Sequence, residues 1–543
     1  MATDMKGKSR EEIIQQDVRD LHKLGYAQQL FREMGGFSNF AISFSIISIL
    51  TGAILLYGYG LKFAGPIINT VGWPLVSFFV LCVAASMAEI ASAYPTAGGL
   101  YYWAYRLGGK TWAWVTAWLN MLGQITITAG INMAAAIYIT GMVTGLLGTP
   151  ADATVPILGA VNGWNFWLFV MVLIMIPQVL INVMGIKLTA ILNDFSVYWH
   201  IGGVIVMALL LTIFGKHHNS LAFMLSTAQT VSPADVAGTF AVGPLTVDSI
   251  MLKIIPGLRG LYGAGIFGFA FVLALLQAQW TYTGYDASAH MAEETYLARM
   301  NSAWGVFLSV AVSAVVGYIS LLALTNSIAP DLLADTANAA YPVLFIAQHA
   351  LQPFFANVIA VIIAVAMWLC GLSSITSMAR MFFAFARDEG MPGSGYIKRV
   401  SHRWRTPANA IVVTSIVAWL ITVYSAAYWV VVSISTTALY LAYAIPVYLN
   451  WRNKRKGQGE FTTKETAPWS LGKWGPAINV VCFSWVIFIT LLFSIPPNEL
   501  AGWTMIVFAI LLVIYWQVSE KRRFAGPRKA TEEELATVEK EFM

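Results

Sequence analysis

Two Thr-Gly pairs interrupt long apolar stretches of the sequence, at places where a regular helix would otherwise be expected. The first pair is Thr51 with Gly52, and the second is Thr283 with Gly284. A helix that unwinds at such a pair presents backbone N–H groups, which suit a carboxylate, and carbonyls, which suit an ammonium group. The sequence therefore predicts a site for a small zwitterion, formed by unwound backbone.

Asp286 and His290 follow the second pair and lie one helical turn apart. A carboxylate in the middle of a membrane-spanning helix costs about 2.5–3.5 kcal/mol unless it is paired or protonated. Asp286 is therefore predicted to bind a substrate cation, to carry a proton or to pair with His290. A capping role at the start of the second half-helix is the alternative, and it is compatible with the others.

The elements that position these residues must lie in lipid, because the composition suits no other solvent. Of the 543 residues, 58% are apolar and only 11% are charged, whereas soluble domains have about 25% charged residues. The chain is therefore predicted to be an all-α polytopic membrane protein in contact with the lipid bilayer. Its net charge of +5 is modest, and we expect no nucleic acid partner.

Twelve stretches reach the length of about 20 apolar residues that a membrane-spanning helix requires. We expect helices at residues 37–61, 72–94, 111–143, 164–186, 195–214, 261–290, 302–327, 353–379, 408–425, 428–449, 477–495 and 500–519. Only four of the 32 lysines and arginines fall in the loops on one side, so both termini are predicted to be cytoplasmic. We expect a multi-pass protein of the plasma membrane.

Interrupted helices at matching positions in two halves of a chain indicate a transporter built from two repeats. The expected divisions are a cytoplasmic N-terminal tail (1–36), a first repeat with helices 1–5 (37–214), an extracellular loop (215–260), a second repeat with helices 6–10 (261–449), a basic cytoplasmic loop (450–476), helices 11 and 12 (477–519) and a cytoplasmic C-terminal tail (520–543). The two Thr-Gly pairs then lie in the first helix of each repeat.

Four strings of residues, 37–52, 87–103, 282–295 and 378–392, occur in an order that is specific to one group of proteins. Through them, residues from about 21 to 516 resemble the amino acid–polyamine–organocation superfamily, and within it the amino acid/choline transporter branch. That branch includes GABA and choline permeases and bidirectional amino acid transporters. The resemblance implies a leucine-transporter-type fold, with a 5+5 inverted repeat and two additional helices.

The resemblance also implies which residues bind the substrate. Its carboxylate would meet the backbone at Leu50, Thr51, Gly52 and Ala53. Its amine would meet carbonyls around Trp280, Tyr282 and Thr283, within a binding segment that continues through Gly284, Tyr285 and Asp286. Trp280 occupies the position of an aromatic outer gate, with a packing role as the alternative. Gln124 is the residue that we expect helix 3 to contribute to the pocket.

Proton coupling is predicted to involve Asp286 and His200. In proton-coupled members of the superfamily, a lysine of the fifth helix reaches the first helix, and His200 falls at that position. A histidine titrates near neutral pH and could load and release a proton. A hydrogen-bonded core histidine is the alternative. Sodium coupling is a further one, for which Ser373, Ser374 and Ser377 could serve as ligands.

Two acidic and two basic residues are predicted to form an ion-pair gate at the cytoplasmic end. They are Glu293, Glu294, Arg380 and Arg387. We expect no cofactor and no bound metal, since the three cysteines and seven histidines are scattered.

The leading prediction is a secondary active transporter for a small amine-bearing solute, an amino acid or GABA, with proton-coupled uptake by alternating access. A choline or polyamine permease is the first alternative, in which Trp280, Tyr282 and Tyr285 could surround a quaternary ammonium group. A membrane-embedded enzyme is the second, although no clustered ligands or nucleophile motif support it. We expect a monomer or a weak homo-oligomer.

Overall fold

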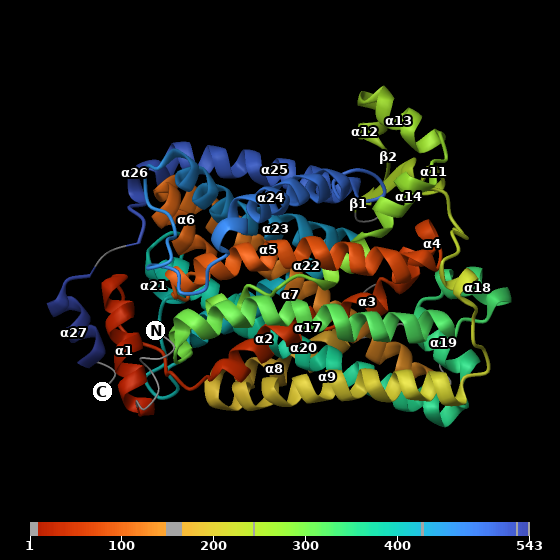
Figure 1. The fold of residues 1–543 in the computed structure, drawn as a ribbon, viewed down its shortest axis with the longest axis horizontal. Helices are drawn as coiled ribbons and strands as arrows, with labels where there is room; N and C mark the ends of the chain where they lie inside the picture. Colours follow the sequence, from red (N-terminus) through yellow and green to blue (C-terminus); the bar gives the residue numbers. More distant parts are fainter. Residues whose placement is uncertain (1–8, 148–165, 243–244, 425–427, 528–529, 541–543) are drawn as a thin grey trace, which may run out of the picture.

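The computed structural model describes residues 9–147, 166–242, 245–424, 428–527 and 530–540. These residues are mostly helical, and the long helices run side by side along one direction (Figure 1). Helices α1 (Arg10–Lys23) and α27 (Glu532–Lys540) lie together at one end of the bundle, where the two chain ends also lie.

Within the described residues, ten long helices are uninterrupted and two are broken. The uninterrupted ones are α5 (Trp73–Ala93), α7 (Lys110–Leu147), α8 (Phe166–Val183), α9 (Ile186–Phe214), α17 (Ala298–Asn326), α20 (Pro353–Arg387), α22 (Ala408–Tyr424), α23 (Tyr428–Lys456), α24 (Gly475–Leu492) and α25 (Glu499–Tyr515). The broken ones are α2 (Gly36–Ile47) with α3 (Gly52–Leu55) and α4 (Tyr57–Ala64), and α14 (Phe267–Ala274) with α15 (Leu276–Thr281) and α16 (Ala287–His290).

By length and apolar composition, nine helical segments of the described residues can cross a membrane. A bent pair, Pro256–Gly263 with Phe267–Thr281, makes a tenth if it counts as one span. Two shorter apolar helices, Trp167–Val183 and Ala408–Thr422, coincide with the fourth and ninth predicted stretches. The prediction of a polytopic helical membrane protein is confirmed, while the number twelve and the 5+5 repeat stay predictions.

Several helices extend beyond the predicted boundaries. Helix α9 begins at Ile186 instead of 195, α20 continues to Arg387 instead of 379, and α23 continues to Lys456 instead of 449. The predicted boundaries lie close to charged residues, but a helix can continue past the lipid into water, where charges are tolerated. The division predicted between residues 425 and 428, and the start of the stretch 164–186, lie outside the described residues.

The start predicted for the sixth helix, residue 261, is wrong. Residue 261 belongs to α13 (Pro256–Gly263), and the chain then turns by 101° before α14 begins at Phe267. Gly265 lies in this turn with φ +60°, a conformation that favours glycine. The turn was missed because the residues on both sides of it are apolar.

The loops at the end opposite α1 carry short elements. Residues 215–260 include a two-stranded antiparallel hairpin, β1 (Thr239–Val242) and β2 (Leu245–Asp248), in which Thr239 pairs with Asp248. The prediction of an all-α chain is therefore wrong for this hairpin. The other elements of these loops are α10 (Leu221–Met224), α11 (Pro233–Ala237), α12 (Ile250–Ile254), α18 (Leu333–Asn338) and α19 (Pro342–Ala350).

Apolar side chains cover the outside of the bundle as well as its inside. Most of α7, α20 and α23 is buried, whereas α9, α24 and α25 are largely exposed. The exposed side chains of α25 include Val507, Ile510, Leu511, Val513 and Ile514. A continuous apolar surface of this kind is stable when lipid covers it. The apolar outer helices therefore indicate that the bundle, with its two broken helices, lies in a membrane.

Candidate functional site

The first broken helix unwinds between Ile47 and Gly52, as predicted. Ser48 ends α2 with φ +23°, and its hydroxyl lies 2.6 Å from the hydroxyl of Thr51. The backbone N–H groups of Thr51 and Gly52 both donate to the carbonyl of Ser48, at 2.8 and 3.0 Å. Leu50 and Ala53 lie buried on either side of this turn.

The second broken helix unwinds between Thr281 and Ala287, also as predicted. Gly284 has φ +87°, and a Cβ atom there would lie 2.3 Å from Cγ2 of Ile46. The carbonyl of Tyr282 accepts a hydrogen bond from the Tyr440 hydroxyl at 2.6 Å. Only glycine fits at position 284, because the first broken helix leaves no room for a side chain.

The two breaks contact each other around a cavity of only about 10 Å³. A Cβ atom on Gly52 would lie 2.9 Å from Cα of Thr281, so the two backbones touch there. The cavity is lined by Ile46, Ile47, Thr51, Gly52, Ile127, Ile131, Trp280, Thr281 and Thr283. It has room for about one water molecule, so this is a closed conformation in which the walls must separate to admit a ligand.

Trp280 forms one wall of the cavity. Its ring meets that of Tyr428 edge to face, with the centroids 5.6 Å apart, and its Nε1–H donates to Oγ of Ser435 at 3.0 Å. Both partners belong to α23, of which Tyr428 is the first residue. The indole is therefore held in one orientation between the second break and α23.

Asp286 is completely buried and contacts four polar side chains. Its Oδ2 accepts from the amides of Asn120 at 3.0 Å and Gln124 at 2.9 Å, and its Oδ1 accepts from the hydroxyl of Tyr443 at 2.8 Å. Nε2 of His290 lies 3.1 Å from Oδ2. Gln124 therefore reaches Asp286 and does not line the small cavity.

The two contacts of the His290 ring indicate which of its nitrogen atoms carry a hydrogen. Nδ1 lies 3.0 Å from the carbonyl oxygen of Ala97, which can only accept, so Nδ1 carries a hydrogen. Nε2 faces Oδ2 of Asp286, and one hydrogen must lie between them, on either atom. The Asp286–His290 pair is therefore satisfied only when it holds one proton more than a carboxylate and a neutral imidazole.

Gly99 leaves the space that the His290 ring fills. Its φ is +46°, and a Cβ atom there would lie 3.1 Å from Nδ1 and Cε1 of the ring. The substitution Gly99→Ala is expected to displace the ring from Ala97 and to slow transport at least about tenfold. Initial uptake rates in vesicles measure this. Gly472→Ala, with φ +57° and nothing within 4 Å, introduces backbone strain alone and serves as the matched control.

His200 on α9 reaches the first break, as expected from the resemblance. Its Nε2 lies 2.8 Å from the hydroxyl of Ser48, and its Nδ1 lies 2.8 Å from the carbonyl of Ser196. A neutral ring that donates through Nδ1 and accepts through Nε2 satisfies both contacts. The hydroxyl of Ser373, an alternative sodium ligand, instead lies within hydrogen-bond distance of Oδ1 of Asn193 and of the carbonyl of Leu369, and donates its one hydrogen to one of them.

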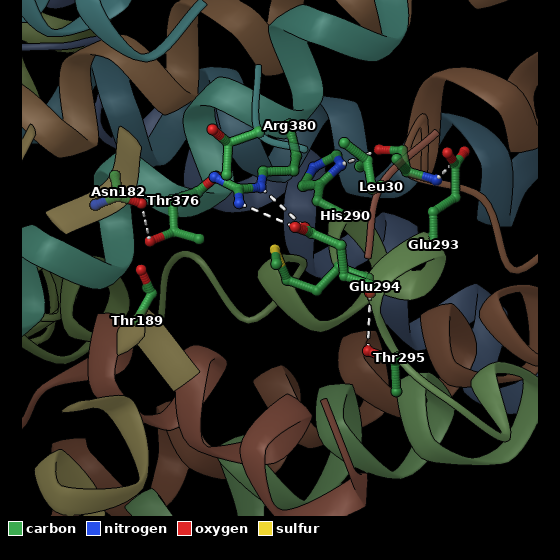
Figure 2. Close-up of polar contacts among 12 residues, drawn as sticks. Leu30, Asn182, Thr189, His290, Glu293, Glu294, Thr295, Thr376 and Arg380 are labelled. Atoms are coloured by element: carbon green, nitrogen blue, oxygen red, sulfur yellow. Dashed lines mark hydrogen bonds and ion pairs between the residues drawn. The ribbon is translucent and has the colours of Figure 1, made fainter. Parts of the chain in front are cut away.

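The four residues predicted for the cytoplasmic gate form two ion pairs. Arg380 binds Glu294 through two hydrogen bonds of 2.9 and 3.0 Å, and both side chains are fully buried (Figure 2). Arg387 binds both oxygens of Glu293, each at 2.9 Å. The N–H of Ala97 also donates to Glu293 at 3.0 Å. Ala97 therefore connects the His290 ring to the Glu293–Arg387 ion pair.

Asp388 adds an acidic group next to the Glu293–Arg387 ion pair. The hydroxyls of Tyr26 and Tyr101 donate to its Oδ2, at 2.6 and 3.1 Å. Burial raises the pKa of Asp388 to about 6, although the Arg387 guanidinium and the two hydroxyls oppose the shift. The guanidinium of Arg387 lies 3.8 Å from the ring centroid of Tyr26.

Sequence analysis missed Tyr443, Tyr440 and Asp388. The two tyrosines lie three residues apart on α23, and so share a face, in a stretch that also contains Ser433, Ser435, Thr436 and Thr437. This run of hydroxyl side chains inside an apolar helix was a usable signal. Tyr285, by contrast, is placed with its ring against those of Tyr440 and Tyr443, and it does not line the cavity.

Comparison with known proteins agrees with the geometry. The sequence model described as "Amino acid permease" matches residues 34–516. Amino-acid permease BAT1 of Arabidopsis thaliana is 34% identical over 93% of this chain and 95% of its own length. The BAT1 homolog of Oryza sativa subsp. japonica is 33% identical over 93% and 94%. A Candida albicans protein named for polyamine transport is 25% identical over 96% and 91%. The chain therefore belongs to the amino acid permease family of the amino acid–polyamine–organocation superfamily.

Proposed function

We propose that the protein is a secondary active transporter that takes up an amino acid or GABA together with a proton, by alternating access. One observation carries the proposal: the two helix breaks close around a small cavity, next to a buried Asp286–His290 pair whose facing Oδ2 and Nε2 atoms lie 3.1 Å apart. We further propose twelve spans in a 5+5 inverted repeat with two additional helices, both termini in the cytoplasm, and a location in the plasma membrane.

The proposed substrate is a zwitterion with a small, uncharged side chain. The described lining of the cavity contains isoleucines, threonines and Trp280 but no carboxylate. Asp286 is the acidic residue nearest in sequence to Trp280 and Thr283, and its oxygens are already in contact with four polar side chains. A polyamine or a choline cation would require an acidic or aromatic partner that this lining offers only in Trp280.

In the open state, backbone groups are proposed to hold the substrate. The carboxylate would bind at Leu50, Thr51, Gly52 and Ala53, and the amine would bind the carbonyls near Trp280, Tyr282 and Thr283. The Tyr282 carbonyl is bound to the Tyr440 hydroxyl in the closed state, so substrate would have to replace this contact. Trp280 would close the outer side, since it is held between the break and α23.

The Asp286–His290 pair is the proposed proton carrier. Loss of its proton would leave a net negative charge in a fully buried place and a bare nitrogen facing a carboxylate, which is unfavourable. The closed conformation is therefore favoured while the pair is loaded. His200, proposed as a second coupling group, would act by holding Ser48 at the first break.

The two ion pairs at the cytoplasmic end are proposed as the inner gate. After proton release, repulsion between the bare Nε2 of His290 and the carboxylate of Asp286 would shift the ring and so disturb its Nδ1–H contact with the carbonyl of Ala97, whose N–H is bound to Glu293. Because Glu293 also binds Arg387, a movement of His290 would affect the Glu293–Arg387 ion pair through Ala97 alone. The gate would then open toward the cytoplasm.

Exchange of labelled substrate in proteoliposomes tests the proposed substrate class without any imposed gradient. Vesicles loaded with one compound are offered labelled alanine, GABA, lysine, putrescine or choline. Alanine and GABA are expected to exchange at least about tenfold faster than putrescine and choline. The reason is that the described lining of the cavity has no carboxylate to bind a second ammonium group or a quaternary ammonium group. Vesicles without protein give the background. Exchange of putrescine or choline with no exchange of amino acids would contradict the proposal.

A further inference from the structure

A hollow of about 800 Å³ opens at the end of the molecule where α1 and α27 lie, and it shares no lining residue with the cavity at the helix breaks. Its walls come from α6 (Leu100–Gly108), the start of α7, the last turns of α23 and the chain after α26 (Lys521–Arg523). Four basic residues line it: Arg106, Lys110, Arg452 and Lys456. The proposed transport cycle makes no use of this hollow.

The hollow has a surplus of positive charge. Glu460 is the one acidic residue among the described residues that line it, and Arg106 neutralises it. Nε of Arg106 lies 2.9 Å from Oε2 of Glu460, and the hydroxyl of Tyr94 donates to Oε1 at 2.9 Å. Both carboxylate oxygens are therefore occupied, and Glu460 cannot compensate the other three cations.

Those three cations have no carboxylate partner within the part of the chain that the structure describes. Lys110 donates to the backbone carbonyls of Lys521 at 3.0 Å and Phe524 at 3.3 Å, and Arg452 donates to the side-chain oxygen of Asn453 at 3.1 Å. Lys456 is exposed. Neutral acceptors leave these charges uncompensated. Cytoplasmic basic residues that only set the topology need not converge on one hollow in this way.

The start of α7 adds to the positive potential. Gly108 and Gly109 line the hollow directly before this helix of 38 residues, which has no acidic residue in its first turn. The N-terminus of a long helix carries a partial positive charge. A Cβ atom on Gly109 would meet nothing within 4 Å, so a ligand can approach this end.

The hollow lies beside a helix that faces lipid. The carbonyls that Lys110 binds belong to residues 521 and 524, a few positions after the end of the largely exposed helix α25. Trp112, two residues after Lys110, is also exposed, and tryptophans gather at the membrane interface. Basic hollows between spanning helices on the cytoplasmic side suit phosphorylated lipid headgroups.

We propose that this hollow binds a phosphate monoester group, carried by an anionic lipid headgroup or by a soluble phosphate ester. Arg452, Lys456 and Lys110 would surround the phosphate. All three belong to the ends of α23 and α7, the helices that also carry the Tyr443 and Gln124 side chains bound to Asp286. A ligand in the hollow would therefore fix the helices that hold the buried acid.

Calorimetric titration of the full-length protein in neutral detergent tests the proposal with two probes: a short-chain phosphatidylinositol phosphate and inositol bisphosphate. The double variant Arg452→Gln/Lys456→Gln is expected to bind roughly 30-fold more weakly than the wild type. The matched control, Lys464→Gln/Lys473→Gln, removes the same charge from exposed positions between α23 and α24, outside the hollow. It is expected to bind as the wild type does.

The two probes separate the two sources of phosphate. Binding of the lipid alone identifies a headgroup site, and equal binding of both probes identifies a site for free phosphate esters; both results support the hollow. A variant with exchanged cations, Arg452→Lys/Lys456→Arg, should retain binding if charge is what matters and excludes misfolding as the cause. Absence of binding by both probes, or an equal loss in the control pair, would overturn the proposal.

Discussion

Replacement of Asp286 by asparagine is expected to abolish the proposed proton-driven uptake while the protein still folds and inserts. Asparagine has the same size, but its amide offers one acceptor oxygen where the carboxylate satisfies donors on both oxygens. Its NH₂ group must face either Tyr443 or the amides of Asn120 and Gln124. Above all, it cannot take up a proton. We expect the initial rate to fall at least about 100-fold.

The control for this prediction is Asp331→Asn, which removes an exposed carboxylate from the loop that follows α17. Both variants should elute from a sizing column as the wild type does. Uptake by Asp286→Asn at the wild-type rate over a range of pH would remove Asp286 from the transport mechanism.

Replacement of Arg380 by glutamine is expected to cause the largest loss of stability. The substitution leaves Glu294 fully buried without a cation, and breaking a buried ion pair in this way costs about 3–5 kcal/mol. The double variant Arg380→Gln/Glu294→Gln removes both charges and should recover most of this loss. Denaturation midpoints in detergent measure the difference.

The pair Lys398 and Glu389 provides the matched control, because it is an exposed ion pair at the same end of the molecule. Lys398→Gln is expected to change the free energy of unfolding by less than about 1 kcal/mol. If the stable double variant still transports at the wild-type rate, the inner gate does not depend on this ion pair. If Arg380→Gln is as stable as the wild type, the account of the buried pair is wrong.

Much of the candidate site could be predicted because charge is scarce in this sequence. Glycine and threonine inside an apolar helix predicted both breaks, and the structure has them at residues 48–51 and 282–286. Acidic and basic residues in a chain with only 11% charge had few possible partners; the four residues expected to form ion pairs do so, and the structure adds that Glu294 pairs with Arg380. Such residues are informative because burying them alone is costly.

The partners of Asp286 could not be predicted in the same way. Asn120, Gln124 and Tyr443 come from α7 and α23, more than 150 positions away in the chain, and their approach depends on how these helices pack. Helix periodicity gives a face but not the neighbour that this face meets. For the same reason the size of the cavity and the role of Gly99 beside His290 became visible only in three dimensions.

The measurement that tests the central claim most directly is proton movement in proteoliposomes that contain a pH-sensitive dye. The account predicts that addition of alanine or GABA acidifies the interior of wild-type vesicles, and that vesicles with His290→Gln or Asp286→Asn show no such change. Substrate uptake by the wild type without any change of internal pH, and without dependence on an imposed pH gradient, would contradict proton coupling through the Asp286–His290 pair.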